Sequence, residues 1–343
     1  MSIIFKDYYT NLPNNHRIAG FDLDHTIIKP KSGNVFPKDN DDWMLLYSCI
    51  KYKLLQLTDN HIIVFFSNQK NVEDDFITKI DKLQILLEVE FIFIAAKAND
   101  IYRKPNIGMF RHIENYLKHK NIKINDLRSN SFYVGDMAGR KDDKMDTDYK
   151  FSLNLKIDFY TPEEFFLGAP KQELNLGGYL LNYTHKNPAL DIMPENNTLV
   201  VISGYPGSGK TYLAKSLDGF AHISRDIYGS KFNKKLQEAL EKNLPIVVEG
   251  MYGTNKTRHD LKDFISTYSK TKYNTIYIRM STSFELSYHM NIFRSLDGMR
   301  QRIPEVAYLK YRKDYEEVIS SDWDTLIECH MNVPPEANKY YLF

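Results

Sequence analysis

Short apolar runs that each stop at a polar cluster alternate with helical patterns along the first half of this chain, and this alternation limits the fold more than any other feature. The apolar runs lie at residues 17–21, 62–66, 91–96 and 131–134. Apolar residues recur at three- and four-residue spacing over residues 43–57, 72–87 and 107–118. Strands that alternate with helices pack as a parallel sheet. The first half is therefore predicted to be α/β.

A second α/β series begins near residue 199. Its expected strands lie at residues 199–202, 246–248 and 275–278. A glycine-rich turn follows the first of these strands and leads into a helix from Thr211. We expect the last seventy residues to be mostly helical, with basic residues interleaved among tyrosines.

Length and a stretch of irregular sequence together divide the chain into domains. A chain of 343 residues exceeds what one hydrophobic core usually supports. Glycines and prolines interrupt any regular pattern between residues 168 and 196. We predict an α/β domain at 1–167, a linker at 168–196 and a second α/β domain at 197–343.

Composition excludes several classes of protein. With 43% hydrophobic and 26% charged residues, the chain can bury a sizeable core and is unlike a disordered protein. A net charge of +1 argues against bulk nonspecific binding of nucleic acid, although a local basic groove is compatible with it. Cys49 and Cys329 are the only cysteines, which excludes a disulfide framework and a cysteine zinc site. No apolar run reaches the roughly 18 residues of a membrane span, and residues 1–15 lack the apolar stretch of a signal peptide. We therefore expect an intracellular protein with no membrane partner.

Two carboxylates stand two residues apart just past the first strand, in Asp22-Leu-Asp24. Alternate residues of an extended chain share a face, so both can address one bound group, and both are candidate Mg²⁺ ligands. A carboxylate nucleophile that forms an aspartyl-phosphate needs such a neighbour as acid and base. Thr26 is a candidate phosphate ligand beside them. The alternative is an ordinary turn, where Asp is common.

Later strand ends supply further polar residues. Ser67 and Asn68 follow the second strand and are candidate phosphate ligands. Lys104 offers a fixed positive charge to a transferring phosphoryl group. Asp136 follows the fourth strand and can complete the Mg²⁺ site. The alternatives are a solvated lysine and an Asx turn, but ligands of open α/β sheets bind at the carboxyl ends of strands, so we predict one phosphate-handling site.

These residues resemble the motifs of the haloacid-dehalogenase-like phosphohydrolases, which are Asp-x-Asp-x-Thr, Ser or Thr, Lys, and Gly-Asp. The resemblance implies a Rossmann-like phosphatase fold with Asp22 as nucleophile and Asp24 as acid and base. Many members carry a second acidic residue after Gly-Asp. The candidates for it are Asp142, Asp143 and Asp148, of which we favour Asp148. Only a loop and one helix separate the first two strands, which leaves no room for a large cap, so we expect the site to admit a macromolecular end.

A glycine-rich loop carries the second candidate site. The segment from Gly204 to Thr211 fits the Walker A pattern G-x-x-x-x-G-K-[ST], after an apolar strand and before a helical pattern. We expect its backbone N–H groups to cradle the phosphates of ATP, Lys210 to reach the β and γ phosphates, and Thr211 to bind Mg²⁺. An ordinary glycine-rich turn is the alternative. The expected ATP-binding residues are Gly204, Gly207, Ser208, Gly209, Lys210 and Thr211.

Polar residues further along the chain favour a kinase. Asp226 is a candidate base for an attacking hydroxyl, with a helix N-terminal Asp as the alternative. Arg294 is a candidate for stabilising the transition state, with a solvated basic face as the alternative. The Asp-Glu pair of motor and helicase ATPases is missing, and Glu249 is its nearest equivalent. The pattern therefore favours a small kinase over a mechanical ATPase.

A phosphatase-type site followed by a P-loop resembles the bifunctional polynucleotide kinase 3′-phosphatases. The similar stretches are Gly20–Asp24, Ser32–Pro37, Tyr102–Pro105, Ser131–Arg140, Thr161–Leu167, Gly204–Thr211, Arg225–Asp226 and Tyr311–Lys313. The resemblance implies a haloacid-dehalogenase-like phosphatase followed by a kinase of the P-loop NTPase fold. It implies removal of a 3′-phosphate through Asp22, transfer of the ATP γ-phosphate to a 5′-hydroxyl with Asp226 as base, Mg²⁺ as cofactor, and DNA strand ends as partner.

The sequence departs from this family at four points. His25 stands where the family usually has Gly, Ser67 where it has Thr, and Glu249 where we expect Asp. We expect the family's N-terminal forkhead-associated domain to be missing, since Asp22 lies so near Met1, and we therefore expect no docking to phosphopeptide scaffolds. We expect a nuclear or cytoplasmic location, including the cytoplasmic site of a virus.

Three hypotheses for the function stay open at this point. DNA end healing leads, and RNA end repair is second because nothing in the sequence discriminates a 2′-hydroxyl from a hydrogen. A nonenzymatic end-binding module is third, although the candidate catalytic residues are all intact. A nearly neutral chain that binds DNA must concentrate its positive charge. The predicted basic grooves contain Arg140, Lys141 and Lys144 at the first site, and Arg294, Arg300 and Arg302 at the second.

Overall fold

The protein forms two compact units. The computed structural model describes residues 2–12, 17–70, 76–122, 127–184, 187, 190–296 and 300–343. Unit 1 contains the residues up to Leu181 and also Lys339–Phe343, and unit 2 is Asn182–Asn338. Among the described residues, no helix combines the length and apolar character that crossing a membrane requires.

Unit 1 is built on a six-stranded sheet with the strand order β1-β6-β5-β2-β7-β8. The strands are β1 (Ile3–Asp7), β2 (Ile18–Phe21), β5 (Ile62–Asn68), β6 (Ile92–Ala96), β7 (Phe132–Val134) and β8 (Asp158–Tyr160). β1 runs antiparallel to β6, and the other pairs are parallel. A small hairpin of β3 (Ile28–Lys29) and β4 (Met44–Leu45) lies outside this sheet.

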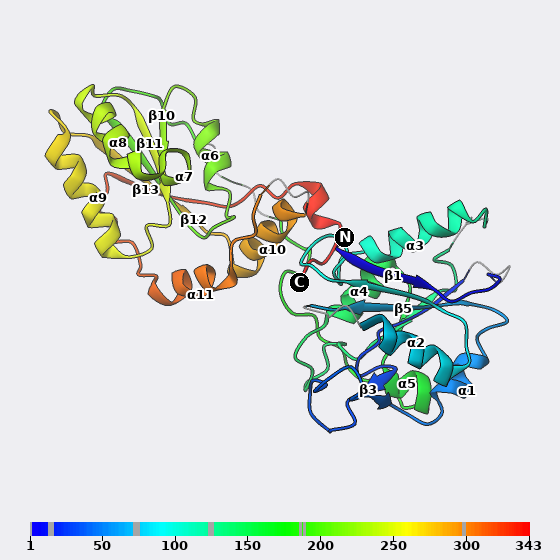
Figure 1. Ribbon diagram of the computed structural model, residues 1–343. Helices are drawn as coiled ribbons and strands as arrows, with labels where there is room; N and C mark the ends of the chain where they lie inside the picture. The colour runs from blue at the N-terminus through cyan, green and yellow to red at the C-terminus, as the bar shows by residue number, and fades with distance from the viewer. Residues whose placement is uncertain are drawn as a thin grey trace. The chain divides into compact units, whose positions relative to one another are not determined.

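Two helix layers cover the sheet of unit 1, because successive residues of its strands point to opposite faces. Ala19 and Phe21 of β2 belong to the apolar cluster that packs α1 (Ile50–Leu55), α2 (Phe76–Leu87) and α5 (Pro162–Leu167). Ile18 belongs to the cluster on the other face, with α3 (Gly108–His119) and α4 (Thr147–Leu155). Figure 1 shows α2 and α3 on opposite sides of this sheet.

Unit 2 contains a five-stranded parallel sheet with the order β10-β11-β9-β12-β13. Its strands are β9 (Thr198–Ser203), β10 (Ala221–Ser224), β11 (Ile246–Gly250), β12 (Asn274–Met280) and β13 (Thr325–Cys329). Its helices are α6 (Lys210–Ser216), α7 (Arg225–Tyr228), α8 (Phe232–Glu241), α9 (Asn255–Tyr268), α10 (Phe284–Ser295) and α11 (Glu305–Asp314), with short 3₁₀ turns at Gly229–Lys231, Ser320–Asp322 and Pro335–Asn338. α8 and α9 pack on one face of the sheet and α6 on the other.

Both sheets place their first parallel strand at a point where the strand order reverses. The chain builds outward from β2 through β5 and β6, then returns to add β7 and β8 on the other side of β2. In unit 2, β9 likewise lies between β11 and β12. Ligands of open α/β sheets bind in the crevice at such a reversal, beyond the carboxyl ends of the strands. The residues after β2, β7 and β9 are therefore positioned to bind ligands.

The α/β class and the predicted strands are confirmed, whereas two predictions for local structure are wrong. Met44–Leu45, expected within a helix over 43–57, instead pair with Ile28–Lys29, and the helix covers only Ile50–Leu55. The last seventy residues contain the edge strand Thr325–Cys329, in which only Cys329 is buried, so no apolar run indicates it. In the helix predicted over 72–87, residues 72–75 lie outside the described part of the chain.

The predicted domain boundaries differ from the division into units. Residues 168–196, expected as a linker, divide at Leu181: the Asn175 N–H donates to Gly139 O in unit 1, and Ile192 packs on the core of unit 2. Lys339–Phe343, expected in the second domain, belong to unit 1. Local composition gives no sign of either packing, because both depend on partners far away in sequence. Pro188, which helped to mark the linker, lies outside the described residues.

Candidate active sites

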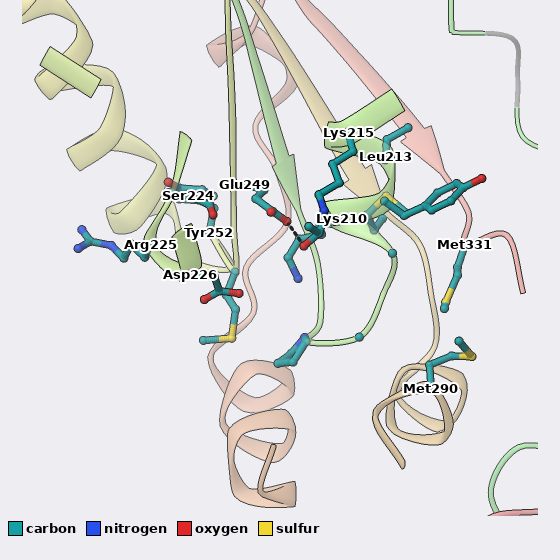
Figure 2. Close-up of a pocket in the computed structure, with 18 of the residues that line it drawn as sticks. Lys210, Leu213, Lys215, Ser224, Arg225, Asp226, Glu249, Tyr252, Met290 and Met331 are labelled. Atoms are coloured by element: carbon teal, nitrogen blue, oxygen red, sulfur yellow. Dashed lines mark hydrogen bonds between the residues drawn. The ribbon is translucent and has the colours of Figure 1, made fainter. Parts of the chain in front are cut away.

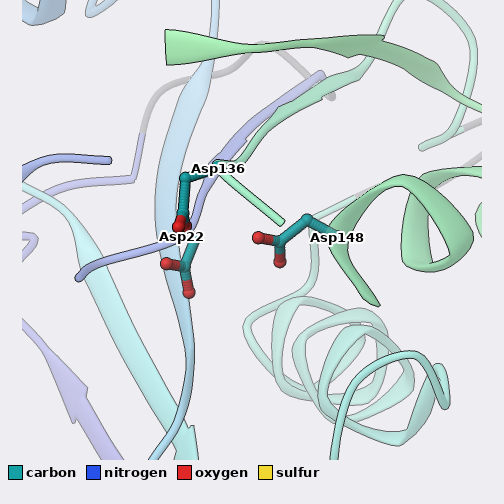
Figure 3. Close-up of side chains that lie close together, drawn as sticks. All are labelled: Asp22, Asp136 and Asp148. Atoms are coloured by element: carbon teal, nitrogen blue, oxygen red, sulfur yellow. The ribbon is translucent and has the colours of Figure 1, made fainter. Parts of the chain in front are cut away.

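Three buried or partly buried carboxylates converge at the reversal point of unit 1. Asp22 follows β2, Asp136 follows β7, and Asp148 lies in the first turn of α4. One carboxylate oxygen of each lies within 4.8 Å of the others (Figure 3). The structure thus brings Asp148, rather than Asp142 or Asp143, to Asp22 and Asp136.

The amine of Lys104 lies beside these carboxylates and is buried. Its Nζ donates to Asp22 Oδ1 at 2.5 Å and to Asp148 Oδ1 at 2.8 Å. It also donates to the Tyr133 hydroxyl at 2.8 Å and to the Phe66 carbonyl at 3.0 Å. The Tyr133 hydroxyl donates in turn to Asp148 Oδ1. Burial disfavours the charged amine, but the two carboxylates outweigh it and raise the pKa of Lys104.

The electrostatics of the trio fit a bound divalent cation. Burial and the neighbouring carboxylates raise the pKa of Asp22 well above its ordinary value, although Lys104 opposes the shift. Burial, followed by the charge of Asp148, raises the pKa of Asp136 to about 7. The single positive charge of Lys104 therefore does not balance the negative charges of the three neighbouring carboxylates. A hard cation with oxygen ligands would relieve this repulsion, which is the chemistry that Mg²⁺ prefers.

Asp24 is not a member of the carboxylate trio and has partners of its own. Gln69 Nε2 donates to Asp24 Oδ2 at 2.6 Å and to Ser67 Oγ at 2.9 Å. The buried Lys79 Nζ lies 3.7 Å from Asp24 Oδ1. Gln69 therefore links the second aspartate to the candidate phosphate ligand Ser67. The side chain of Asp24 is not among the clustered ligand atoms, so it remains a proposal as a metal ligand.

The two other predicted phosphate ligands differ in their surroundings. Thr26 is fully buried, and its Oγ1 has no hydrogen-bond partner among the described residues. The amide of Asn68 instead exchanges two hydrogen bonds with the backbone of Lys104: Nδ2 donates to Lys104 O at 3.1 Å, and Oδ1 accepts from Lys104 N at 2.9 Å. Asn68 thus fixes the segment that carries the buried lysine.

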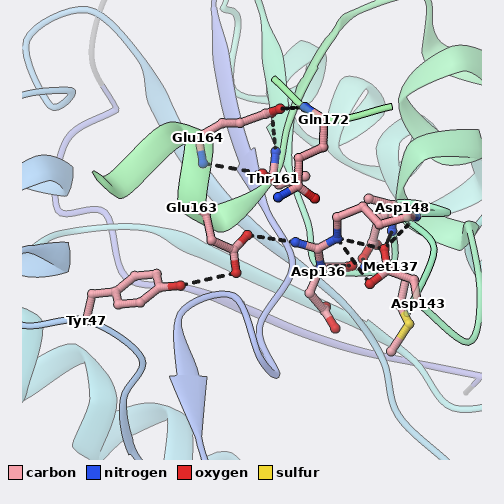
Figure 4. Close-up of polar contacts among 11 residues, drawn as sticks. Tyr47, Asp136, Met137, Asp143, Asp148, Thr161, Glu163, Glu164 and Gln172 are labelled. Carbon is pink, nitrogen blue, oxygen red and sulfur yellow. Dashed lines mark hydrogen bonds and ion pairs between the residues drawn. The ribbon is translucent and has the colours of Figure 1, made fainter. Parts of the chain in front are cut away.

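Arg140 is engaged inside the protein rather than free for nucleic acid, and Figure 4 labels two of its partners, Asp143 and Glu163. Its guanidinium pairs with Asp143 at 2.9 Å and with Glu163 at 2.8 Å, and it donates to the Asp136 carbonyl at 2.9 Å. The arginine therefore secures the loop that presents Asp136. Of the predicted basic group at this site, Lys141 and Lys144 are the exposed members.

In unit 2, the P-loop joins β9 to α6. Gly207 has φ of 79°, and a Cβ there would lie 2.6 Å from the Ser287 carbonyl of α10, so only glycine fits. Lys210 Nζ donates to the carbonyls of Gly204 and Tyr205, at 2.9 and 2.6 Å. Burial lowers the pKa of Lys210 to about 8, and Arg294 adds to the shift.

Glu249 connects the P-loop to β10. It is the second-last residue of β11 and is 6% exposed. The Thr211 hydroxyl donates to its Oε2 at 2.8 Å, and His222 Nε2 lies 2.9 Å from its Oε1. Glu249 therefore orients the hydroxyl that was predicted to bind Mg²⁺.

A cavity of about 1730 Å³ opens beside the P-loop within unit 2. Asp226, from the first turn of α7, and Lys210 both line it (Figure 2). Arg294 and Arg300 line it as well, and burial lowers the pKa of Arg294, whose Nε has no hydrogen-bond partner among the described residues. Arg302 lies elsewhere: it donates to the Tyr288 hydroxyl and stacks over that ring. Residues 297–299, within the basic stretch predicted from Arg294 to Arg302, lie outside the described part of the chain.

Comparison with known proteins agrees with this pair of sites. A family model described as polynucleotide kinase 3 phosphatase matches residues 17–166. The bifunctional polynucleotide phosphatase/kinase of Schizosaccharomyces pombe is 34% identical over 97% of this chain and 83% of its own length. This chain belongs to the bifunctional polynucleotide phosphatase/kinase family. A relative from Acanthamoeba polyphaga mimivirus, named for the same two activities, is 30% identical over 90% of this chain and 84% of its own. The polynucleotide 3′-phosphatase of Arabidopsis thaliana is 33% identical over 48% of this chain and 26% of its own.

The backbone of His25 has a left-handed conformation, which would suit the glycine that the family resemblance implies at this position. Its φ is 57°, in the left-handed region that glycine adopts without penalty and other residues at a cost of about 1 kcal/mol. The ring Nε2 lies 2.9 Å from the Val35 carbonyl. This departure from the family is therefore accommodated by contact with the loop that follows β3.

Several residues of both sites were not singled out by the sequence. They are Gln69 and Lys79 beside Asp24, Tyr133 beside Lys104, and His222 beside Glu249. Gln69 directly follows Ser67-Asn68 at a strand end, so its position was a usable signal. The other three lie in ordinary helix or strand patterns, where nothing in the local sequence separates them from structural residues.

Proposed function

We propose that this protein heals nucleic-acid strand ends with two activities, removal of 3′-phosphates by unit 1 and ATP-dependent phosphorylation of 5′-hydroxyls by unit 2. The observation that carries the proposal is the occurrence of an aspartate trio with a buried lysine and a P-loop cavity on one chain of the bifunctional family. The products, a 3′-hydroxyl and a 5′-phosphate, are the ends that a ligase joins. DNA is the proposed substrate.

For the phosphatase, Asp22 is the proposed nucleophile. One of its oxygens attacks the phosphorus while the bond to the 3′-oxygen breaks, and Asp24 gives a proton to the leaving oxygen. Asp24 then takes a proton from water, which attacks the aspartyl-phosphate and releases phosphate and Asp22. The buried Lys104 faces the developing negative charge, and Ser67 and Thr26 are the proposed phosphate contacts.

Asp22, Asp136 and Asp148 are the proposed ligands of Mg²⁺, which would supply charge neutralisation at the phosphate. The protein's own contribution is to hold these carboxylates together. Arg140 secures the loop of Asp136, and Lys104 bridges the two other carboxylates. Asp136 therefore has its own supporting contact, whereas Asp22 and Asp148 share Lys104.

For the kinase, the P-loop backbone and Lys210 would hold the ATP phosphates, with Thr211 as the proposed Mg²⁺ ligand. Asp226 would take the proton of the 5′-hydroxyl as its oxygen attacks the γ-phosphorus, breaking the bond to ADP. Arg294, which lines the same cavity, is the proposed partner of the charge that develops on the transferred group. Glu249 would keep the Thr211 hydroxyl oriented.

The order of strands supports a haloacid-dehalogenase-like phosphatase fold for unit 1 and a P-loop NTPase fold for unit 2. Each active site follows from that order, because Asp22 and the P-loop both come directly after the strand at the reversal point. The proposed contacts to the substrate backbone are the exposed Lys141 and Lys144 of unit 1 and Arg300 in the cavity of unit 2.

A nicked DNA duplex with a 3′-phosphate and a 5′-hydroxyl tests both activities in one reaction with Mg²⁺ and labelled ATP. We expect wild type to convert both ends. Asp22→Asn should abolish phosphate release and keep 5′ labelling, and Lys210→Ala should do the reverse. Each variant is then the folding control of the other.

The same reaction on RNA ends discriminates the two substrates. Turnover of RNA ends with DNA ends unchanged would replace DNA by RNA in the proposal. If a folded protein that binds ATP converts neither, the polynucleotide assignment fails. Raising the salt concentration should weaken substrate binding, because phosphate contacts release counterions.

A further inference from the structure

The last residues of the chain pack into unit 1 although they follow the whole of unit 2 in sequence. Lys339–Phe343 belong to unit 1, with Leu342 only 6% exposed. Tyr340 packs against the apolar cluster that contains α3 and α4. Its hydroxyl accepts from Arg111 of α3 at 3.3 Å. We call Tyr340–Phe343 the docking segment.

Asn154 of α4 binds the docking segment and the lysine loop at the same time. Its amide is buried, and Nδ2 donates to Pro105 O and to Tyr341 O, both at 2.8 Å. Its Oδ1 accepts from Tyr341 N at 2.8 Å. Pro105 directly follows Lys104, so one amide ties the segment to the backbone that carries the buried lysine.

Lys150 of α4 makes a second connection one turn earlier. Its side chain is 1% exposed, and Nζ pairs with Asp146 at 2.8 Å. The same amine donates to the carbonyls of Gly177 at 2.8 Å and Phe343 at 2.5 Å. Without the docking segment, this buried cation would lose one of its three oxygen partners, and the loss of a hydrogen bond to a buried charged group costs free energy.

Both connections lead to residues of the phosphatase site. α4 carries Asp148 in its first turn, and Asp148 Oδ1 accepts from Lys104 Nζ. The docking segment therefore holds one helix from which Asp148 projects and one loop from which Lys104 projects. We propose that Tyr340–Phe343 position Asp148 and Lys104, so that phosphate hydrolysis by unit 1 depends on residues that follow unit 2 in the sequence.

Residues that hold a metal ligand in place have an effect of known size on metal affinity and activity. Loss of an outer partner of a metal ligand reduces metal affinity or activity about 10- to 100-fold. We expect a chain that ends at Lys339 to lose about 10- to 100-fold in phosphatase kcat and to need more Mg²⁺ for half-maximal rate. Kinase activity, on the same molecule, should stay within about twofold of wild type, because the P-loop residues have no contact with the segment among the described hydrogen bonds.

The experiment compares the shortened chain, Asn154→Ala and both changes together with wild type, on a substrate with a 3′-phosphate and a 5′-hydroxyl. Lys339→Ala is the matched control, because this exposed side chain lies beside the segment without entering it. The losses in phosphatase kcat should be non-additive, because the two changes remove the same hydrogen bonds. Asn154→Ala should therefore lower kcat by a smaller factor in the shortened chain than in the full one. Thermal unfolding of each variant gives the folded fraction.

The positioning role of the docking segment rests on the proposed phosphatase activity of unit 1. Different results would refute each of these two proposals. If wild type releases no phosphate, the proposed function fails. If wild type is active and the shortened chain keeps its kcat and its Mg²⁺ requirement, the positioning role is overturned. A loss that only follows the folded fraction, at an unchanged Mg²⁺ requirement, overturns it too, since plain destabilisation predicts that pattern.

Discussion

Lys104→Met is the most informative single change, because it removes one cation from the centre of unit 1 and leaves its size nearly unchanged. The amine is held by two carboxylates, a hydroxyl and a carbonyl, at 2.5 to 3.0 Å. Its side chain is 2% exposed, and so is that of Asp148. Water therefore cannot replace the lost charge, and the carboxylates are left close together.

The expected effect is large on both activity and stability. Removing one partner from a buried ion pair costs about 3–5 kcal/mol. Loss of one preorganised electrostatic group costs about 10²–10³ in kcat. Because Lys104 lowers the pKa of Asp22, its removal raises that pKa further above the ordinary value of 3.8.

The sign of the pH dependence follows from proton binding. A carboxyl with a raised pKa binds more protons in the folded state than in the unfolded one. The free energy of unfolding of the variant should therefore fall as the pH rises above about 4, and it should keep falling to a higher pH than that of wild type, where Asp22 titrates at a lower pKa. The acidic limb of its phosphatase profile should move to higher pH, because Asp22, the proposed nucleophile, would have to be ionised to attack.

The assay follows 3′-phosphate release and 5′ labelling in the same reaction, from pH 5 to 9. Lys97→Met, at an exposed lysine, is the control for the loss of one positive charge. Kinase activity should persist in both variants, and Mg²⁺ should raise the melting temperature of Lys104→Met more than that of wild type. If Lys104→Met keeps phosphatase kcat within about tenfold of wild type, the electrostatic account of this site is refuted.

Three further predictions concern the supporting residues. Arg140→Ala should lower phosphatase kcat about 10- to 100-fold and leave the salt dependence of DNA binding unchanged. Lys141→Ala should instead make DNA binding less dependent on salt. Phosphatase kinetics and DNA-binding titrations at several salt concentrations, on both variants, test this difference. Glu249→Gln should lower kinase kcat about tenfold, because Thr211 loses its carboxylate partner. The phosphatase activity of this variant should stay normal. An equal loss of both activities in steady-state assays would contradict the prediction. The pKa of Lys210 is lowered to about 8 in the folded state, so the nucleotide-free protein should become more stable as the pH rises from about 8 to about 10.5. Binding of ATP near pH 8 should be accompanied by proton uptake at Lys210. Calorimetry in buffers of different ionisation enthalpy measures this uptake, and Lys210→Met should remove it.

The sequence alone predicted the parts of both sites that lie next to strand ends. Asp22, Asp136 and the P-loop were found because an apolar run followed by a polar cluster is a local pattern, and the strand order then brings those ends to one edge of a sheet. Even Asp148 was favoured, but only through the family resemblance. Nothing local separates it from Asp142 and Asp143.

Charge pairing could not be predicted from the sequence. The basic stretch after β7 indicated a nucleic-acid groove, yet Arg140 is committed to Asp143, Glu163 and the Asp136 carbonyl. A sequence shows that a residue is charged but not whether an opposite charge lies beside it. Glu163 is distant in the chain and reaches Arg140 only because α5 packs next to the sheet.

The sequence by itself determined the α/β class, the positions of the two candidate phosphate-binding loops and the family, because strand periodicity, glycine spacing and short motifs are local properties. Only the tertiary structure decided which carboxylate joins Asp22 and Asp136, that Lys104 is buried among them, and that Tyr340–Phe343 belong to unit 1. These contacts form between residues tens to hundreds of positions apart. They are set by how helices pack on a sheet, and no local pattern encodes that packing.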